Sequence, residues 1–393
     1  MTKLDAKALN TVTGGTSKCE PTPRPARPPR IAAASPRSAE GLNETRAAAS
    51  GAARLSGEAG TRSVPVGVTD GSGEREMTVI DPRVGFLARR IAGLPLRTRR
   101  SVLRARFTIA GVLRGFETPG HARLFQRVLR QSAREARRLE RAAVLHNLQT
   151  EAEWLALLVR TVPALLRDTR HVAVSDPAAL ERVAATGRPV ILTPLHMGAY
   201  VFSLASLMVR FFPGRPLLVL RQRDDMPLET AVIERIREVG VAMRFHQVTD
   251  RMGFLEAVRF ARNGAVVVNF CDLDPAYGAP APMPVLGLET RFAFGTDTLA
   301  RLTNALVVPL ACTMEPKGDL VRVGPTFEVQ SSAPDERARV AALVRAHIEA
   351  SLRARPEQWH LWSALRDYLP VADTVTGAAS PTTEADEQIR TAA

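Results

Sequence analysis

The sequence predicts an α/β fold, a mixed sheet flanked by helices and preceded by basic amphipathic helices. From residue 172 onward, short apolar runs alternate with longer helical stretches, the order typical of a sheet with helices packed on its faces. A hydrophobic fraction of 45% supports a substantial core. Ahead of the alternation, an arginine-rich stretch carries apolar residues at spacings of three and four, which indicates amphipathic helices.

The chain of 393 residues divides into three parts by composition. The first aromatic residue is Phe86, and the residues before it are dominated by Ala, Gly, Pro, Ser, Thr and Arg. Such a segment buries too little apolar area to offset its chain entropy. We therefore predict a disordered segment at 1–80, one large folded domain at 81–370, and a disordered tail at 371–393.

The net charge of +13 has a definite place in the chain. Residues 83–141 contain 16 arginines, no lysine and three acidic residues, so their net charge equals that of the whole protein. Pro95 and Pro119 are expected to break the helices there. Such helices fit an anionic membrane surface or an acidic carrier protein, or simply form a solvated face. A nucleic-acid partner is not expected, because no recognisable binding module accompanies the charge.

The later elements follow in order. Four apolar runs predict buried strands, and five periodic stretches predict helices. The strands are expected at 190–192, 217–220, 266–268 and 306–308, and the helices at 199–212, 227–239, 251–263, 294–303 and 334–354.

Several classes of protein are excluded by what the sequence lacks. Three cysteines are too few and too scattered for a disulfide framework or a cysteine-rich zinc site, so no metal is expected. No apolar stretch is long enough to span a membrane, and no secretory signal is visible. We expect a cytoplasmic protein, or one bound peripherally at the inner face of the cell membrane.

The strongest candidate for chemistry is His196. A buried apolar run leads into it, and the small residue Gly198 and a helical stretch follow. In α/β proteins functional groups gather beyond the carboxyl ends of strands, and a histidine there can act as a general base. A lone histidine at such a place can equally be structural.

Six segments in the same order resemble the blocks of the bacterial lipid A biosynthesis lauroyl/myristoyl acyltransferases, which are similar to lysophospholipid acyltransferases. The first resembles the family's His-Phe-Gly-Asn-Trp-Glu block, and the last its closing His-Pro-Glu-Gln-Trp motif. The six segments are Gly187–Tyr200, Val219–Leu228, Asn269–Asp274, Pro284–Gly295, Leu299–Pro309 and Arg355–Trp362.

The resemblance implies acyl transfer from a thioester, on acyl carrier protein or coenzyme A, to a hydroxyl or amine of a lipid, sugar or biosynthetic intermediate. It implies no cofactor, since the acyl thioester is a co-substrate, and it implies that His196 is the general base. The family's orienting carboxylate lies five residues after the histidine, where this chain has Val201.

Three explanations of Val201 are open. Another acid takes over the orienting role, with Asp272 and Asp274 the best candidates and Asp224 and Asp225 weaker ones. Alternatively, the acceptor is an amine or another nucleophile that needs less help. In the third explanation the protein is a non-catalytic homologue that binds an acyl chain or a carrier protein.

Substrate-binding roles are predicted for arginines and glycines of these segments. Arginine pairs bidentately with phosphate or carboxylate, although each arginine can also be a solvated surface residue. A thiol nucleophile is a remote alternative, because a buried cysteine such as Cys271 is usually inert. The predicted substrate-binding residues are Gly198, Arg221, Arg223, Gly287 and Arg291.

Residues 1–15 resemble a double-glycine leader of secreted bacterial peptides, ending at Gly14 and Gly15. This resemblance would connect the enzyme to a specialised peptide or polyketide natural-product pathway, as an acyltransferase, a condensing enzyme or a chain-release enzyme. The alternative is a disordered tail that contains three apolar residues.

Overall fold

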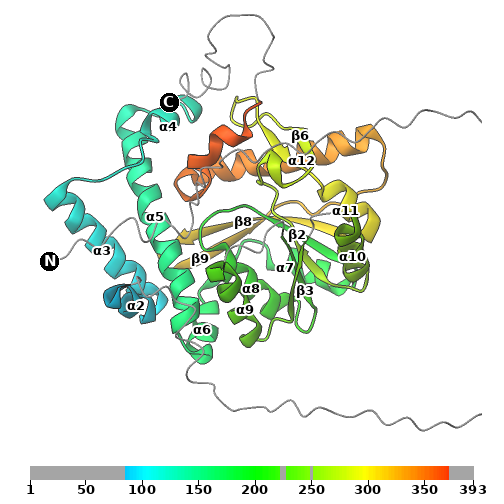
Figure 1. Ribbon diagram of the computed structural model, residues 1–393, viewed down its shortest axis with the longest axis horizontal. Coiled ribbons are helices and arrows are strands. Elements are labelled where there is room, and N and C mark those ends of the chain that lie inside the picture. Colours follow the sequence, from blue (N-terminus) through cyan, green and yellow to red (C-terminus); the bar gives the residue numbers. More distant parts are fainter. Residues whose placement is uncertain (1–84, 222–226, 248–250, 371–393) are drawn as a thin grey trace, which may run out of the picture.

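Figure 1 shows the computed structural model, which describes residues 85–221, 227–247 and 251–370. The predicted segments at 1–80 and 371–393, with the leader-like residues 1–15, lie outside the described residues.

The core of the molecule is a seven-stranded sheet with the strand order β1-β9-β8-β2-β5-β3-β4. All neighbouring strands are parallel except the β8–β9 hairpin, which confirms the predicted mixed α/β sheet. The strands are β1 (Val172–Val174), β2 (Val190–Pro194), β3 (Leu217–Arg221), β4 (Met243–Gln247), β5 (Val266–Val268), β8 (Leu306–Glu315) and β9 (Gly318–Val323). A separate hairpin joins β6 (Pro280–Pro282) to β7 (Arg291–Ala293).

Helices cover both faces of the sheet (Figure 1). Side chains alternate along a strand, so Ile191 of β2 packs with one layer of helices while Val190 and Leu192 pack with the other. The first layer contains α10 (Arg251–Arg262), α11 (Thr296–Thr303) and α12 (Pro334–Ala354), and the second contains α6 (Val162–Thr169), α7 (Pro177–Ala185), α8 (Tyr200–Phe211) and α9 (Pro227–Glu238).

The predicted basic helices form a layer ahead of the sheet. Here α2 (Phe86–Gly93) and α3 (Leu96–Arg114) are separated at Pro95, and Pro119 lies between α3 and α4 (Ala122–Val128). The long α5 (Ala133–Val159) begins at Ser132, whose hydroxyl accepts a hydrogen bond from the backbone N–H of Glu135. Figure 1 shows α5 between the helices α2 and α3 on one side and the sheet on the other.

A buried ion network joins α3 to α5 and to the sheet. The guanidinium of Arg100 donates to Glu153 of α5 at 2.5 Å and to Asp319 of β9 at 2.5 Å. It also donates to the carbonyl oxygen of Gly318 at 3.1 Å. Burial raises the pKa of Asp319 to about 7, against the opposing effect of Arg100. One arginine is therefore shared by two buried carboxyl groups where three elements meet.

Among the described residues, no helix combines the length and apolar character that crossing a membrane requires.

Replacing Arg100 with Met should destabilise the fold by about 3–5 kcal/mol, because two buried carboxylates lose their counter-charge. A carboxyl whose folded-state pKa lies above its unfolded value favours folding at low pH, and this contribution is lost as the pH rises through the folded-state pKa. Removing Arg100 raises the pKa of Asp319 further, so the loss should be greater at about pH 8 than at about pH 5. Urea unfolding of the wild type and of Arg100→Met at both pH values measures this difference in the free energy of unfolding.

The exposed Arg104 of the same helix provides the matched control. Arg104→Met should change the free energy of unfolding by no more than about 0.5 kcal/mol. Equal losses in the two variants would contradict the structural role of Arg100.

Candidate functional site

His196 lies in the short loop between the end of β2 and the start of α8. The loop turns at Gly198, whose φ of +54° is in the left-handed region. A Cβ at this position would lie 2.6 Å from the carbonyl oxygen of Cys312 and 3.1 Å from the side chain of Gln358. Gly198 is buried against β8, so the structure requires a glycine here for close backbone approach.

Asp272 faces His196 from the neighbouring strand. The segment after β5 continues alongside β2, with the N–H of Cys271 donating to the carbonyl oxygen of Pro194 at 3.2 Å. This brings Oδ1 of Asp272 to 2.9 Å from Nδ1 of His196, while its Oδ2 accepts from the backbone N–H of His196 at 2.8 Å. The Asp272 side chain is fully buried and that of His196 is 20% exposed.

This geometry selects one form of the neutral imidazole. A carboxylate accepts hydrogen bonds, so the proton of the neutral His196 ring is expected on Nδ1, facing Asp272. The lone pair is then on Nε2, the ring nitrogen that Asp272 does not contact. Such a histidine can take a proton from a group placed next to Nε2.

A third segment completes the arrangement. Trp359 follows η2 (Pro356–Gln358) and its indole Nε1–H donates to Oδ2 of Asp272 at 2.8 Å. Its backbone forms an antiparallel bridge with Met197. In that bridge the N–H of His360 donates to the carbonyl oxygen of His196 at 2.9 Å. The Asp272 carboxylate therefore accepts three N–H groups, two from His196 and one from Trp359.

Gln358 and His360 hold the same segment in place from two sides. The buried amide of Gln358 exchanges hydrogen bonds with the backbone N–H and carbonyl oxygen of Met314 in β8, at 2.7 and 3.0 Å. The His360 ring links the carbonyl oxygen of Gly198 to the side chain of Asn147 in α5, at 2.9 Å each. Burial of the ring lowers the pKa of His360 to about 4, so it is a neutral support at physiological pH.

Aromatic rings form the walls around His196. The ring of Phe270 stacks on the imidazole with centroids 4.0 Å apart and planes inclined by 19°. Tyr200 presents an edge at 5.4 Å and 79°. Val201, the next residue of α8, is buried between α8 and the sheet, in the same core cluster as Val190 and Leu192. The carboxylate that contacts His196 therefore comes from the loop after β5 and not from α8.

The other predicted site residues lie elsewhere or carry other contacts. The carboxylate of Asp274 caps the short helix η1 (Pro275–Tyr277) by accepting from the N–H of Ala276 at 2.8 Å. Gly287 occupies the turn between β6 and β7 with a φ of +82°, and Arg291 is an exposed residue of β7. The β6–β7 hairpin is connected to the site through Phe292, whose ring packs 5.0 Å from that of Tyr368. The hydroxyl of Tyr368 donates to the carbonyl oxygen of Asp272 at 2.7 Å.

Some of these predictions fall where the structure gives no side chain. Arg221 is the last residue of β3, but its side chain is not among those described, and Arg223, Asp224 and Asp225 lie outside the described residues. Cys271 is buried, and burial raises the pKa of its thiol well above the usual value. A thiol in that state is a poor nucleophile.

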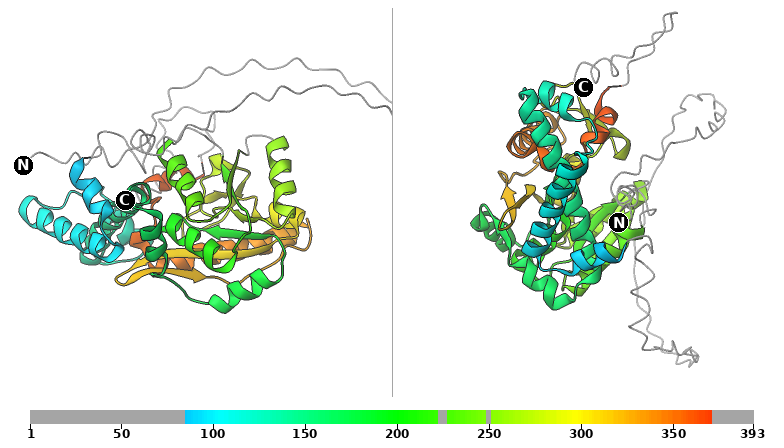
Figure 2. Two further views of the ribbon diagram at one scale, coloured as in Figure 1. Left: turned by 90° about the horizontal axis from the view of Figure 1, so that it is seen from below. Right: turned by 90° about the vertical axis from the view of Figure 1, so that its left-hand side faces the viewer.

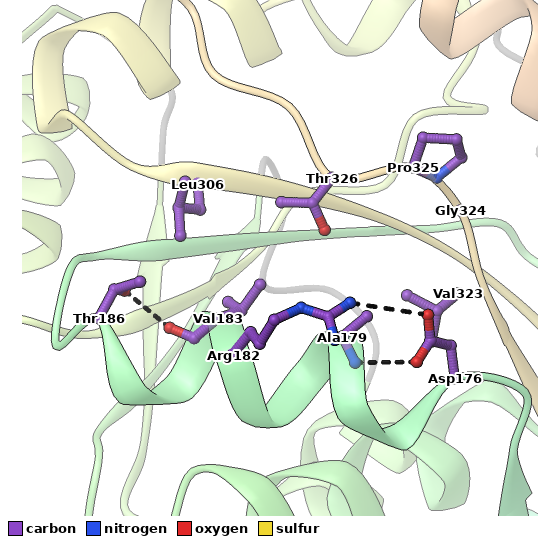
Figure 3. Close-up of a pocket in the computed structure, with 10 residues that line it drawn as sticks. All are labelled: Asp176, Ala179, Arg182, Val183, Thr186, Leu306, Val323, Gly324, Pro325 and Thr326. Carbon is purple, nitrogen blue, oxygen red and sulfur yellow. Dashed lines mark hydrogen bonds and ion pairs between the residues drawn. The ribbon is translucent and has the colours of Figure 1, made fainter.

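A surface pocket lies at the opposite edge of the sheet (Figure 3). It is bordered by α7, by Leu306 at the start of β8 and by Val323 at the end of β9. Leu306 pairs with Val190, the first residue of β2, whereas His196 follows the last. The pocket is therefore separate from the His196 site, and its Asp176 and Arg182 form an ion pair with each other.

Sequence reasoning missed the residues of the closing motif that hold the site. Trp359 lies in the last of the six segments, Arg355–Trp362, and its indole N–H donates to the carboxylate of Asp272. A buried tryptophan usually finds an acceptor for its indole N–H, which was the available signal. Within the described ranges, no cluster of three or more His, Cys, Asp or Glu side chains is suited to a metal ion.

Comparison with known protein families gives a match. The family model described as bacterial lipid A biosynthesis acyltransferase matches residues 159–364, just over half of the chain. The matched range contains β2, β5, His196, Asp272 and Trp359. No curated protein matches the chain.

Two glycines with positive φ provide a test of the loop geometry. Gly198→Ala should cost roughly 2 kcal/mol or more beyond Gly287→Ala in the free energy of unfolding, because only the first adds a backbone clash. At Gly287 nothing lies within 4 Å of the added Cβ, so only the strain of the left-handed conformation remains. Denaturant unfolding of both variants measures the difference, and equal costs would contradict the close packing of the loop on β8.

Proposed function

The chain belongs to the bacterial lipid A biosynthesis acyltransferase family, and on this premise we propose that it transfers an acyl group from a thioester to a hydroxyl or amine, with His196 as general base. Family membership establishes an acyltransferase in general terms. The observation that carries the finer proposal is the contact of 2.9 Å between Oδ1 of Asp272 and Nδ1 of His196.

The proposed reaction begins at Nε2 of His196. This nitrogen removes the proton of the acceptor hydroxyl or amine while the acceptor attacks the thioester carbonyl carbon. The resulting tetrahedral species collapses by breaking the carbon–sulfur bond, and the departing thiolate takes the proton from Nε2. The products are an ester or amide and a free thiol, and the histidine returns to its starting state.

Asp272 supports both states of the ring in this scheme. Its carboxylate orients the neutral imidazole through Nδ1–H and stabilises the positive charge that the ring gains when it takes the acceptor's proton. The hydrogen bonds from Trp359 and from the backbone of His196 fix the orientation of that carboxylate. This arrangement favours the first explanation of Val201, in which another acid performs the role of the carboxylate missing from α8.

The donor follows from the same chemistry. A thioester is already activated and releases a stable thiolate, so the proposed reaction requires no further cofactor. Acyl carrier protein and coenzyme A are the two proposed carriers. The acceptor is a lipid, a sugar or an intermediate of a specialised pathway, and the leader-like residues 1–15 that suggest the last of these lie outside the described residues.

The alternative function is a non-catalytic protein that binds an acyl chain or carrier. Val201 favours it, because the family's acid position is filled by a buried apolar residue. A histidine and a buried aspartate can also form a structural hydrogen bond. This alternative predicts binding of an acyl thioester without turnover.

We expect His196→Ala to reduce acyl transfer by about 10³-fold or more, and Asp272→Asn by roughly 10²- to 10⁴-fold. The second variant removes the charge but keeps the shape of the side chain, so a folded protein is expected. Acyl carrier protein and coenzyme A thioesters with candidate acceptors are incubated with each variant, and the released thiol is measured.

Asp274→Asn distinguishes the two acids of the same loop. Because Asp274 caps η1, this variant should lose less than about tenfold of the activity. Equal acyl transfer by wild type and His196→Ala would remove His196 from the mechanism. If Asp274→Asn loses more acyl-transfer activity than Asp272→Asn, then Asp274 and not Asp272 orients His196.

A further inference from the structure

The outward side of α3 exposes large apolar side chains. In a globular protein the apolar side of a helix normally faces the core. The inward side of α3 is already occupied by the buried residues Leu96, Arg99, Arg100 and Gly111. The exposed apolar residues form a second face, at Val102 (37% exposed), Ile109 (60%), Val112 (76%) and Leu113 (76%).

The spacing of these residues produces a continuous stripe. Val102, Ile109 and Leu113 are seven and four residues apart, so they project from the same side of the helix. With a rise of about 1.5 Å per residue, the stripe is roughly 16 Å long. Figure 2 shows this helix, in cyan, projecting from one end of the molecule.

The charge around the stripe has one sign. Residues 86–114 contain eight arginines and no acidic residue. Arg106 lies one turn from both Val102 and Ile109, and Arg104 and Arg114 are also exposed. Long arginine side chains can lie along an apolar surface while the guanidinium binds phosphate. The stripe and its flanking arginines are therefore complementary to a partner with an apolar interior and anionic groups at its surface.

We propose that the exposed face of α3 docks on an anionic lipid bilayer, with Val102, Ile109, Val112 and Leu113 inserted among the acyl chains and the neighbouring arginines on the phosphates. A projecting ridge of aliphatic side chains fits a deformable bilayer interface, which is the usual setting for a helix with this composition. An acidic carrier protein would need a complementary groove, and it is the competing outcome of the test. The proposal does not depend on the catalytic one, because docking is measured without substrate.

The test is flotation of the full chain with vesicles of phosphatidylethanolamine and phosphatidylglycerol. We expect the protein to float with these vesicles, to bind purely phosphatidylcholine vesicles much less, and to be released at about 1 M salt. The double variant Ile109→Ser, Leu113→Ser should partition about tenfold more weakly, because two side chains no longer enter the apolar region. The double variant Arg104→Gln, Arg106→Gln should also bind more weakly.

Matched controls use exposed residues on other helices. Leu166→Ser with Met252→Ser removes two exposed apolar side chains from α6 and α10, and should leave flotation unchanged. Arg259→Gln with Arg353→Gln removes two exposed arginines from α10 and α12, with the same expectation.

Two results would overturn the proposal. One is flotation of the α3 variants equal to that of wild type. The other is an absence of wild-type binding to anionic vesicles. If the α3 variants then impair turnover of acyl carrier protein thioesters but not of coenzyme A thioesters, the result assigns this face to an acidic carrier protein.

Discussion

The buried carboxylate of Asp272 is the constraint on which the site depends. A buried carboxylate is costly unless its oxygens accept hydrogen bonds, and this one is bound by two N–H groups of His196 and one of Trp359. These bonds join two segments of the chain, the loop after β2 and the closing motif, to the segment after β5. The adjacency of β2 and β5 in the sheet brings His196 and Asp272 together, and the closing motif covers them.

Helix α5 connects this site to the basic helices. Asn147 contacts His360, and the hydroxyl of Thr150 lies 3.5 Å from the carbonyl oxygen of Gly198. One turn further along, Glu153 accepts from Arg100 of α3. The helix with the exposed apolar stripe and the loop that carries His196 are therefore both held by α5.

Much of the sheet could be predicted from local pattern. The runs at 190–192, 217–220, 266–268 and 306–308 each lie within an observed strand, because buried strands are short and continuously apolar. The strands β1, β4, β6, β7 and β9 were not predicted. For example, β1 is three residues long with an exposed centre, and three of the five residues of β4 are polar. Asp272 was named as a candidate because it follows a predicted strand. The bond from Trp359 could not be derived, because it depends on contact between residues 87 positions apart.

The most direct test of the account is the tautomer of His196, measured by ¹⁵N NMR of histidine-labelled protein and assigned with a His196→Gln spectrum. We predict that the neutral ring carries its proton on Nδ1, with an Nδ1–H signal typical of a strong hydrogen bond and an unprotonated Nε2. In Asp272→Asn the Nδ1–H signal should weaken or disappear. A neutral ring protonated at Nε2 in the wild type would contradict the account, because its lone pair would then face Asp272 and not the acceptor.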